Sequence, residues 1–161
     1  MPYGENAGSG TKVRGATAED VEIVHALTCE LADAIGDSPP RFEAVQARLS
    51  ELLEEPRARV LVAEDGGGVV VGAASLWIKP DLAHGDTVIE VPMLVVAEDH
   101  RRKGVGRLLM EEIQRLAAES AASLIELVAT RKNKPARDFY RSLGFVETKH
   151  VSLEFVGDLK G

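Results

Sequence analysis

The chain has 161 residues, with 19 Lys and Arg against 26 Asp and Glu, which gives a formal net charge of −7. A hydrophobic fraction of 45% with 28% charged residues excludes a disordered chain, and the length favours one domain with its own core. The longest nearly uncharged apolar run, Val69 to Ile78, is far shorter than the about 20 residues of a membrane span. Cys29 is the only cysteine, and the four histidines lack ligand spacing. We therefore expect a cytoplasmic domain without a metal or membrane contact.

The charges are unevenly distributed along the chain. Residues 1–100 carry 7 basic and 18 acidic side chains, a balance of −11, whereas residues 101–161 carry 12 basic and 8 acidic ones, a balance of +4. This distribution indicates an anion-binding C-terminal part and an acidic N-terminal part.

The spacing of apolar residues predicts the order of helices and strands. We expect residues 1–11 to form a flexible tail and residues 12–161 a single domain. Helices are predicted over residues 17–35, 40–55, 104–119 and 133–143. Strands are predicted over residues 12–16, 58–63, 69–78, 87–96 and 124–129, with one or two more within 145–155. Short turns join the early strands and helices join the later ones, which predicts an α/β fold with a mixed sheet, antiparallel first and partly parallel later.

The sharpest local signal is the segment from Arg101 to Arg107, which lies between an apolar strand and an amphipathic helix. Gly104 and Gly106 permit a close approach of the backbone to a ligand, and the first amides of a helix lack intrahelical partners. Four cationic side chains surround these amides, a pattern that suits a pyrophosphate group. A basic loop with a glycine-rich helix start is the plainer interpretation. A Walker loop is absent, and Leu109 occupies the third glycine position of a dinucleotide fingerprint.

Two motifs carry a family resemblance. The stretch V-P-M-L-V-V-A-E-D-H-R-R-K-G-V-G-R-L-L-M resembles the GNAT superfamily of N-acetyltransferases, whose pattern is a strand, then [RQ]-x-x-G-x-[GA], then a helix. The later block N-K-P-A-R-D-F-Y-R-S-L-G-F, from Asn133 to Phe145, resembles a second element of the same family. The resemblance implies a mostly antiparallel central sheet whose parallel fourth and fifth strands splay apart, flanked by helices.

The resemblance also implies acetyl-CoA as the acyl donor and assigns residues to it. The amides after Arg101 would hold the pyrophosphate, and the strand before them would pair with the pantetheine arm. Asn133 and Ala136 on the later helix would lie near the cofactor. The residues implied in pyrophosphate binding are Arg101, Arg102, Lys103, Gly104, Val105, Gly106 and Arg107. Those implied in binding of the pantetheine arm are Leu94, Val95 and Val96.

Pro92 and Glu90 are singled out within the strand that precedes this basic segment. Proline is disfavoured inside a central strand but tolerated at a bulge, so we predict a bulge near Pro92, with two short strands as the alternative. A free alkyl amine has a pKa near ~10, so an acceptor ammonium must lose a proton before it attacks. Glu90, where several family members carry a catalytic Glu, is our candidate base, directly or through water. Simple alternation would place it on the face of Leu94 and Val96, unless the bulge breaks that register.

Tyr140 and Glu126 complete the set of candidate catalytic residues. Tyr140 matches the family position that commonly protonates the departing thiolate, and a tyrosine that only packs locally is the alternative. Glu126 is a second candidate base, although a lone acid on a strand more often faces solvent or forms an ion pair.

The predicted activity is transfer of an acetyl group from acetyl-CoA to a primary amine by direct attack in a ternary complex. A non-catalytic acyl-CoA-binding domain is the alternative. The net charge of −7 and the 4% aromatic content disfavour binding to nucleic acid. The acidic N-terminal part favours a cationic acceptor, either a small molecule or a protein amine, and homodimers are common in the family.

Overall fold

The computed structural model describes residues 5–6 and 10–160, and the expected tail over residues 1–11 lies largely outside them. The chain divides into two compact units, Met1–Thr130 and Arg131–Gly161, which are described separately. Within the described residues, no helix combines the length and the apolar character that a membrane crossing requires.

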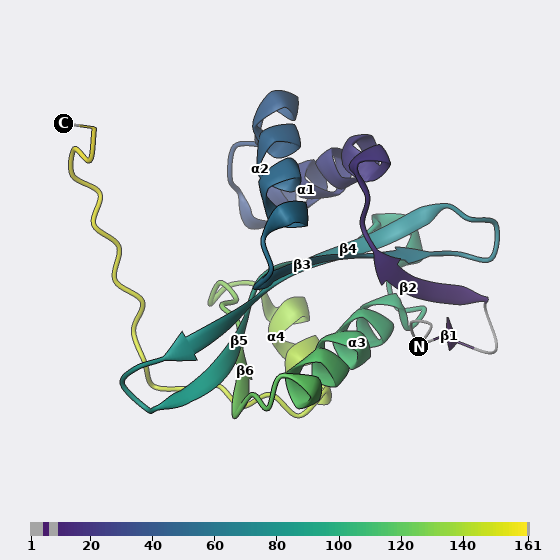
Figure 1. Ribbon diagram of the computed structural model, residues 1–161. Coiled ribbons are helices and arrows are strands. Elements are labelled where there is room, and N and C mark those ends of the chain that lie inside the picture. The colour runs from purple at the N-terminus through teal and green to yellow at the C-terminus, as the bar shows by residue number, and fades with distance from the viewer. Residues whose placement is uncertain (1–4, 7–9, 161) are drawn as a thin grey trace. The chain divides into compact units, whose positions relative to one another are not determined.

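The first unit is built on a sheet whose strands follow one another in sequence order (Figure 1). Its strands are β1 (Glu5–Asn6), β2 (Thr11–Gly15), β3 (Ala58–Glu64), β4 (Val70–Asp81), β5 (Asp86–Val96) and β6 (Leu124–Glu126). Its helices are α1 (Val21–Ile35), α2 (Phe42–Glu54) and α3 (Val105–Glu119), with short 3₁₀ turns at Ala18–Asp20 and Glu98–His100. Pairing is antiparallel from β1 to β5 and parallel between β5 and β6. The predicted mixed, mostly antiparallel sheet is confirmed.

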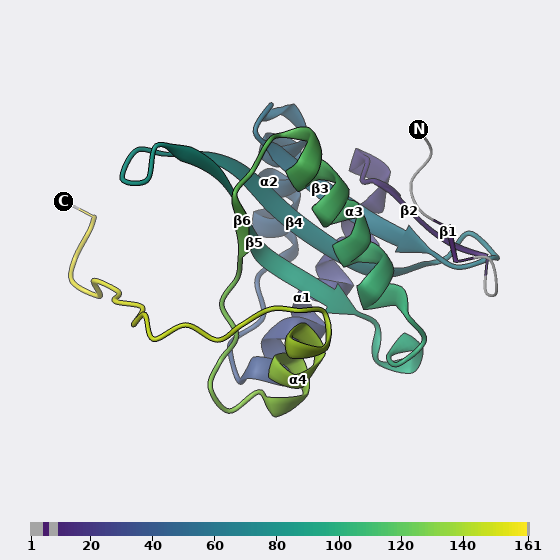
Figure 2. The same cartoon turned by 90° about the horizontal axis from the view of Figure 1, so that it is seen from below.

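Helices cover both faces of this sheet (Figures 1 and 2). α1 and α2 lie on one face and α3 on the other. Val24 and Leu27 of α1 pack with Val62, Ala73 and Val95 on the first face, and these five residues form the centre of a buried cluster. On the second face, Gly72 lets α3 approach β4 closely, because a Cβ there would lie 3.0 Å from Val105 Cγ1.

A bulge interrupts the pairing of β4 with β5 at the predicted place. Ser75 pairs with Met93, and the next pair along is Trp77 with Glu90, so β5 carries one residue more than β4 between them. Pro92 lies in this interval, where a missing backbone N–H breaks no regular ladder bond. The prediction of a bulge near Pro92 is therefore confirmed, and the alternative of two separate strands is wrong.

The parallel strands β5 and β6 pair over only three positions, from Val88 with Leu124 to Glu90 with Glu126. β6 is shorter than the predicted 124–129 strand, and its first residue, Leu124, is 49% exposed. β5 continues alone to Val96, and among the described residues no strand pairs with its far edge beyond Glu90. The two strands part where the resemblance implies a splay.

Over residues 131–160, which the structure describes, the second unit contains one helix, α4 (Lys134–Ser142). Asn133 caps its N-terminus by accepting a hydrogen bond from the Ala136 N–H at 3.2 Å, and Gly144 follows its end at φ 94°. The predicted final strands within 145–155 are wrong: residues 145–160 contain no strand. The alternation of Val151, Leu153 and Phe155 suits a strand, but a strand is stable only when a neighbour satisfies its backbone groups.

Candidate functional site

The start of α3 has the backbone geometry of an anion-binding turn. Gly104 caps the helix at φ 84°, and Arg102, two residues before it, adopts the left-handed conformation at φ 63°. No side chain caps the helix, and its first turn contains no acidic residue. The N–H groups of the first turn therefore keep their partial positive charge for a ligand.

The four basic side chains around this turn are Arg101, Arg102, Lys103 and Arg107, and all four are exposed. In the part of the chain that the structure describes, none of them forms a salt bridge; the Nε of Arg101 donates to the carbonyl oxygen of Val96 at 3.1 Å. Their charge is thus not neutralised by neighbouring carboxylates. By contrast, Lys134, Arg137 and Arg141 of the second unit pair with Asp138 or Glu147.

The open edge of β5 leads directly into this turn. The N–H of Ala97 donates to the Val71 carbonyl at 2.8 Å, which fixes the direction of the backbone groups. Because these groups alternate between the two edges of a strand, those of Val95 face β4, while those of Leu94 and Val96 face the open edge. An extended ligand with amide groups can bond such an edge as another strand would.

Glu90 lies beside this edge, in a cluster of charged residues. Its carboxylate accepts a hydrogen bond from Lys79 Nζ at 2.5 Å, and the two side chains are 39% and 45% exposed. This bond, with lesser contributions from Glu126 and Asp81, raises the pKa of Lys79 above its usual value. Glu126 is the parallel register partner of Glu90, so the two candidate bases lie side by side.

The bulge changes the face on which Glu90 lies. Glu90 pairs with Trp77 and Met93 pairs with Ser75, and residues two apart on β4 share a face. Glu90 therefore lies on the face of Met93, toward α1 and α2. Simple alternation would have placed it with Leu94, which is wrong because the extra residue in β5 reverses the parity.

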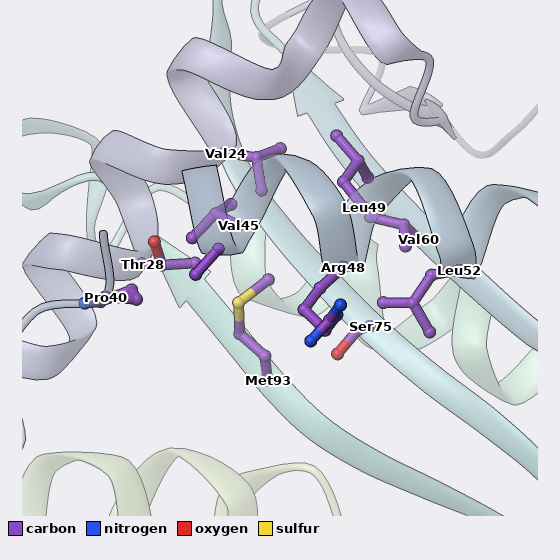
Figure 3. Close-up of a pocket in the computed structure, with 11 residues that line it drawn as sticks. Val24, Thr28, Pro40, Val45, Arg48, Leu49, Leu52, Val60, Ser75 and Met93 are labelled. Carbon is purple, nitrogen blue, oxygen red and sulfur yellow. The ribbon is translucent and has the colours of Figure 1, made fainter. Parts of the chain in front are cut away.

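A pocket opens on this same face, between α1, α2 and the sheet (Figure 3). Figure 3 shows the Met93 side chain extending from the sheet toward Val24 and Val45 of the two helices. Most of the lining residues carry only carbon or thioether side chains, and the full lining is Val24, Thr28, Pro40, Ala44, Val45, Arg48, Leu49, Leu52, Val60, Ser75 and Met93. The sequence analysis missed this pocket and Lys79. Periodicity marks the apolar lining residues only as core-facing, because the pocket forms when five segments distant in sequence come together: α1, residues 40–52, β3, β4 and β5.

Tyr140 belongs to an aromatic group in the second unit. Its ring centroid lies 5.2 Å from that of Phe139 and 5.6 Å from that of Phe145. Burial raises the pKa of the Tyr140 hydroxyl above its usual value, so the hydroxyl keeps its proton at neutral pH. The side-chain oxygen of Asn133 is engaged in capping α4.

The described residues contain no group of three or more His, Cys, Asp or Glu side chains that could hold a metal ion. The ionisable residues beside the β5 edge are the Lys79–Glu90 pair and Glu126. The arrangement therefore comprises a cationic turn, a β5 edge that no other described strand covers beyond Glu90, two adjacent carboxylates and an apolar pocket, all within the first unit.

Comparison with known proteins agrees with this arrangement. Residues 24–145 match the acetyltransferase (GNAT) family. The chain is 30% identical over 137 residues to the aminoalkylphosphonate N-acetyltransferase of Salmonella typhimurium, with 85% of this chain and 86% of that protein covered. The protein belongs to the GNAT family of acetyltransferases, and it is an acyltransferase.

Solved structures share the fold. The chain resembles a transcriptional regulator from Bacillus halodurans, with a TM-score of 0.80 at 21% identity over 90% of this chain and 98% of that one. It also resembles an aminoglycoside acetyltransferase from an uncultured soil sample, with a TM-score of 0.69 at 24% identity over 90% and 98% of the two chains. At these identities the similarity establishes the fold alone.

Proposed function

We propose that the protein transfers the acetyl group of acetyl-CoA to a primary amine by direct attack in a ternary complex. The observation that carries the proposal is the continuity of the open β5 edge with the cationic turn. The pantetheine arm would pair with Leu94 and Val96, and the pyrophosphate would accept hydrogen bonds from the amides at the start of α3. Unpaired Arg and Lys side chains around the turn would add charge-assisted contacts.

Glu90 is proposed to prepare the acceptor. It takes a proton from the substrate ammonium, directly or through water, and leaves a free amine whose lone pair attacks the thioester carbonyl carbon. A C–N bond forms and the carbonyl oxygen becomes an oxyanion, which a backbone N–H near Leu94 would stabilise. Glu126, beside Glu90, is the second candidate for the same task.

Tyr140 is proposed to complete the transfer. When the tetrahedral intermediate collapses, the C–S bond breaks and its electron pair remains on sulfur. The Tyr140 hydroxyl donates its proton to that thiolate, and the acetylated nitrogen gives up its extra proton, through water, to the resulting tyrosinate. These transfers yield the neutral N-acetyl product, free CoA thiol and the restored Tyr140 hydroxyl. A hydroxyl with a raised pKa is protonated when the substrate binds, as an acid of this kind must be.

The test combines a binding assay with a turnover assay. Acetyl-CoA is expected to raise the melting temperature, and a panel of primary amines is expected to release free thiol together with acetylated amine, identified by mass. Stabilisation by acetyl-CoA without acetylation of any amine would support the non-catalytic acyl-CoA-binding alternative. A homodimer and a cytoplasmic location stay predictions.

A further inference from the structure

The pocket between α1, α2 and the sheet is lined mainly by apolar side chains. Val24, Leu49 and Val60 are 4%, 4% and 6% exposed, and Met93 adds a half-buried thioether. The guanidinium of Arg48 lies at the rim, where it pairs with Glu51 and both side chains are 67% exposed. A ligand group that enters this pocket therefore passes the charged pair at the rim and meets hydrocarbon inside.

The pocket and the carboxylates have a fixed spacing because they share one face of the sheet. Ser75 and Met93 line the pocket, and the next register pair on that face is Trp77 with Glu90. Two residues along a strand span about 7 Å. Without the bulge, Met93 and Glu90 would lie on opposite faces of the sheet, so the bulge brings the Met93 side of the pocket onto the face of Glu90.

We propose that this pocket binds the apolar substituent of the acceptor, which is a primary amine with a branched or cyclic hydrocarbon group. This inference rests on the proposed function and names the acceptor class for it. The ammonium would lie near Glu90 and Glu126 while the hydrocarbon fills the pocket. A volume of about 200 Å³ accommodates roughly six or seven carbon groups, if each occupies about as much space as a water molecule in the liquid.

The same geometry disfavours polycationic acceptors. A polyamine or an aminoglycoside would carry a second ammonium group into a hydrocarbon lining, where no carboxylate is present to pair with it. An unpaired charge in such surroundings is costly to desolvate. Removal of apolar surface from water, in contrast, favours binding by roughly fourfold for each buried methylene.

The decisive experiment compares 3-methylbutylamine, 1,4-diaminobutane and 2-aminoethanol in the thiol-release assay with saturating acetyl-CoA. We expect kcat/KM to be at least tenfold higher for 3-methylbutylamine than for either polar amine. A separate titration follows the fluorescence of Trp77, the only tryptophan, which lies opposite Glu90. We expect 3-methylbutylamine to change its emission at lower concentration than 1,4-diaminobutane does.

Two substitutions on α2 test the location. Ala44 lines the pocket and is exposed, so Ala44→Leu should fill space without disrupting the core. Ala47 is exposed on the same helix and does not line the pocket, so Ala47→Leu is the matched control. We expect Ala44→Leu to reduce kcat/KM for 3-methylbutylamine about tenfold and to leave the KM of acetyl-CoA unchanged, while Ala47→Leu changes neither.

The outcomes separate this inference from the proposed function. One contrary result is that amines are acetylated with a polar amine preferred, and another is that both α2 substitutions have equal effects. Either result would overturn the proposal of an apolar acceptor and leave the proposed acetyltransferase activity intact. If no amine is acetylated, the proposed function is wrong, and the Trp77 titration then decides whether the pocket binds an apolar amine. Tighter binding of 3-methylbutylamine, weakened only by Ala44→Leu, then supports the pocket assignment, and equal or absent binding of the amines overturns it.

Discussion

Lys79 donates a hydrogen bond to Glu90 at 2.5 Å, so the candidate base already holds an alkylammonium group supplied by the chain itself. The proposed acceptor presents the same chemical group to the same carboxylate. Both partners are more than a third exposed, so the bond is accessible to exchange with a substrate. Lys79 is therefore expected to compete with the acceptor for Glu90.

Replacing Lys79 with Met tests this competition. We expect the KM of the amine to fall by up to about fivefold, because an exposed pair contributes at most about 1 kcal/mol and its removal frees the carboxylate. The free energy of unfolding should change by less than about 1 kcal/mol. Lys79→Arg keeps a cation at the position and should retain the wild-type KM. A KM that rises in Lys79→Met would instead mean that Lys79 holds Glu90 in its working position.

Replacing Tyr140 with Phe tests the proposed acid. The ring and its contacts with Phe139 and Phe145 remain, but the proton donor is lost. We expect kcat to fall by roughly 10²-fold or more, while the affinity for acetyl-CoA, measured calorimetrically, is unchanged. Full activity in Tyr140→Phe would contradict the assignment.

The pH profile supplies a second test of Tyr140. Its folded pKa is raised by burial, and the proposed role requires the protonated form. Ionisation of Tyr140 should therefore not lower the wild-type kcat near neutral pH. It should lower kcat, as an alkaline limb of the pH profile, only above the ordinary tyrosine pKa near ~10. Tyr140→Phe should lack that alkaline limb.

Much of the fold and the cationic turn could be predicted because their signals are local. Helical spacing predicted α3 within one residue of its bounds, and two glycines with four basic residues indicated the turn at its start. Pro92 indicated the bulge, because a missing N–H is tolerated at few places in a central strand. These features depend on residues close together in the sequence.

The face of Glu90 and the pocket could not be predicted in the same way. One extra residue in β5 reverses the alternation between the two sides of the bulge, so the face of Glu90 depends on the pairing register with β4 rather than on the β5 sequence. The pocket needs α1, α2 and three strands to be assembled first. The prediction of a last strand was wrong for a related reason. Apolar alternation over residues 151–155 suits a strand, but a strand also needs a neighbouring strand to pair with, which the alternation does not provide.

Asp20 provides a test of stability against pH. Its side chain, 9% exposed, accepts hydrogen bonds from Arg14 Nη1 at 2.8 Å and Nη2 at 2.9 Å and from the Thr17 N–H at 2.7 Å. The bond from Arg14 lowers the pKa of Asp20 below its usual value of 3.8. A lowered folded pKa contributes stability that is present above the unfolded pKa and lost as the pH falls through the folded pKa.

We therefore expect Asp20→Asn to lower the free energy of unfolding at pH 7 by about 2–3 kcal/mol, measured in urea. The wild-type melting temperature should fall on acidification below about pH 4, and this fall should be smaller in Asp20→Asn. Asp33→Asn, on the exposed side of α1, is the control and should match the wild type at pH 7. An Asp20→Asn protein as stable as the control would contradict the role of this carboxylate.

Gly72 links the packing of the sheet to the cationic turn. A methyl group there would lie 3.0 Å from Val105 Cγ1, 3.2 Å from the Val95 carbonyl oxygen and 3.3 Å from Leu109 Cδ1. Val105 is the first residue of α3, so relief of these contacts moves the helix start that is proposed to hold the pyrophosphate. We expect Gly72→Ala to cost about 1–3 kcal/mol of stability and to weaken acetyl-CoA binding.

Chemical denaturation and calorimetry with acetyl-CoA measure the two effects of Gly72→Ala. Gly67→Ala is the matched control, since a Cβ there meets only Asp65 Oδ1, at 3.4 Å. Combining Gly72→Ala with Val105→Ala should give a loss smaller than the sum of the single losses, because the second change removes the closest contact. Strictly additive losses would mean that the added methyl group is accommodated elsewhere. Val105 is both the residue that the added methyl group contacts and the first residue of α3. Gly72→Ala should therefore lower stability and acetyl-CoA affinity together.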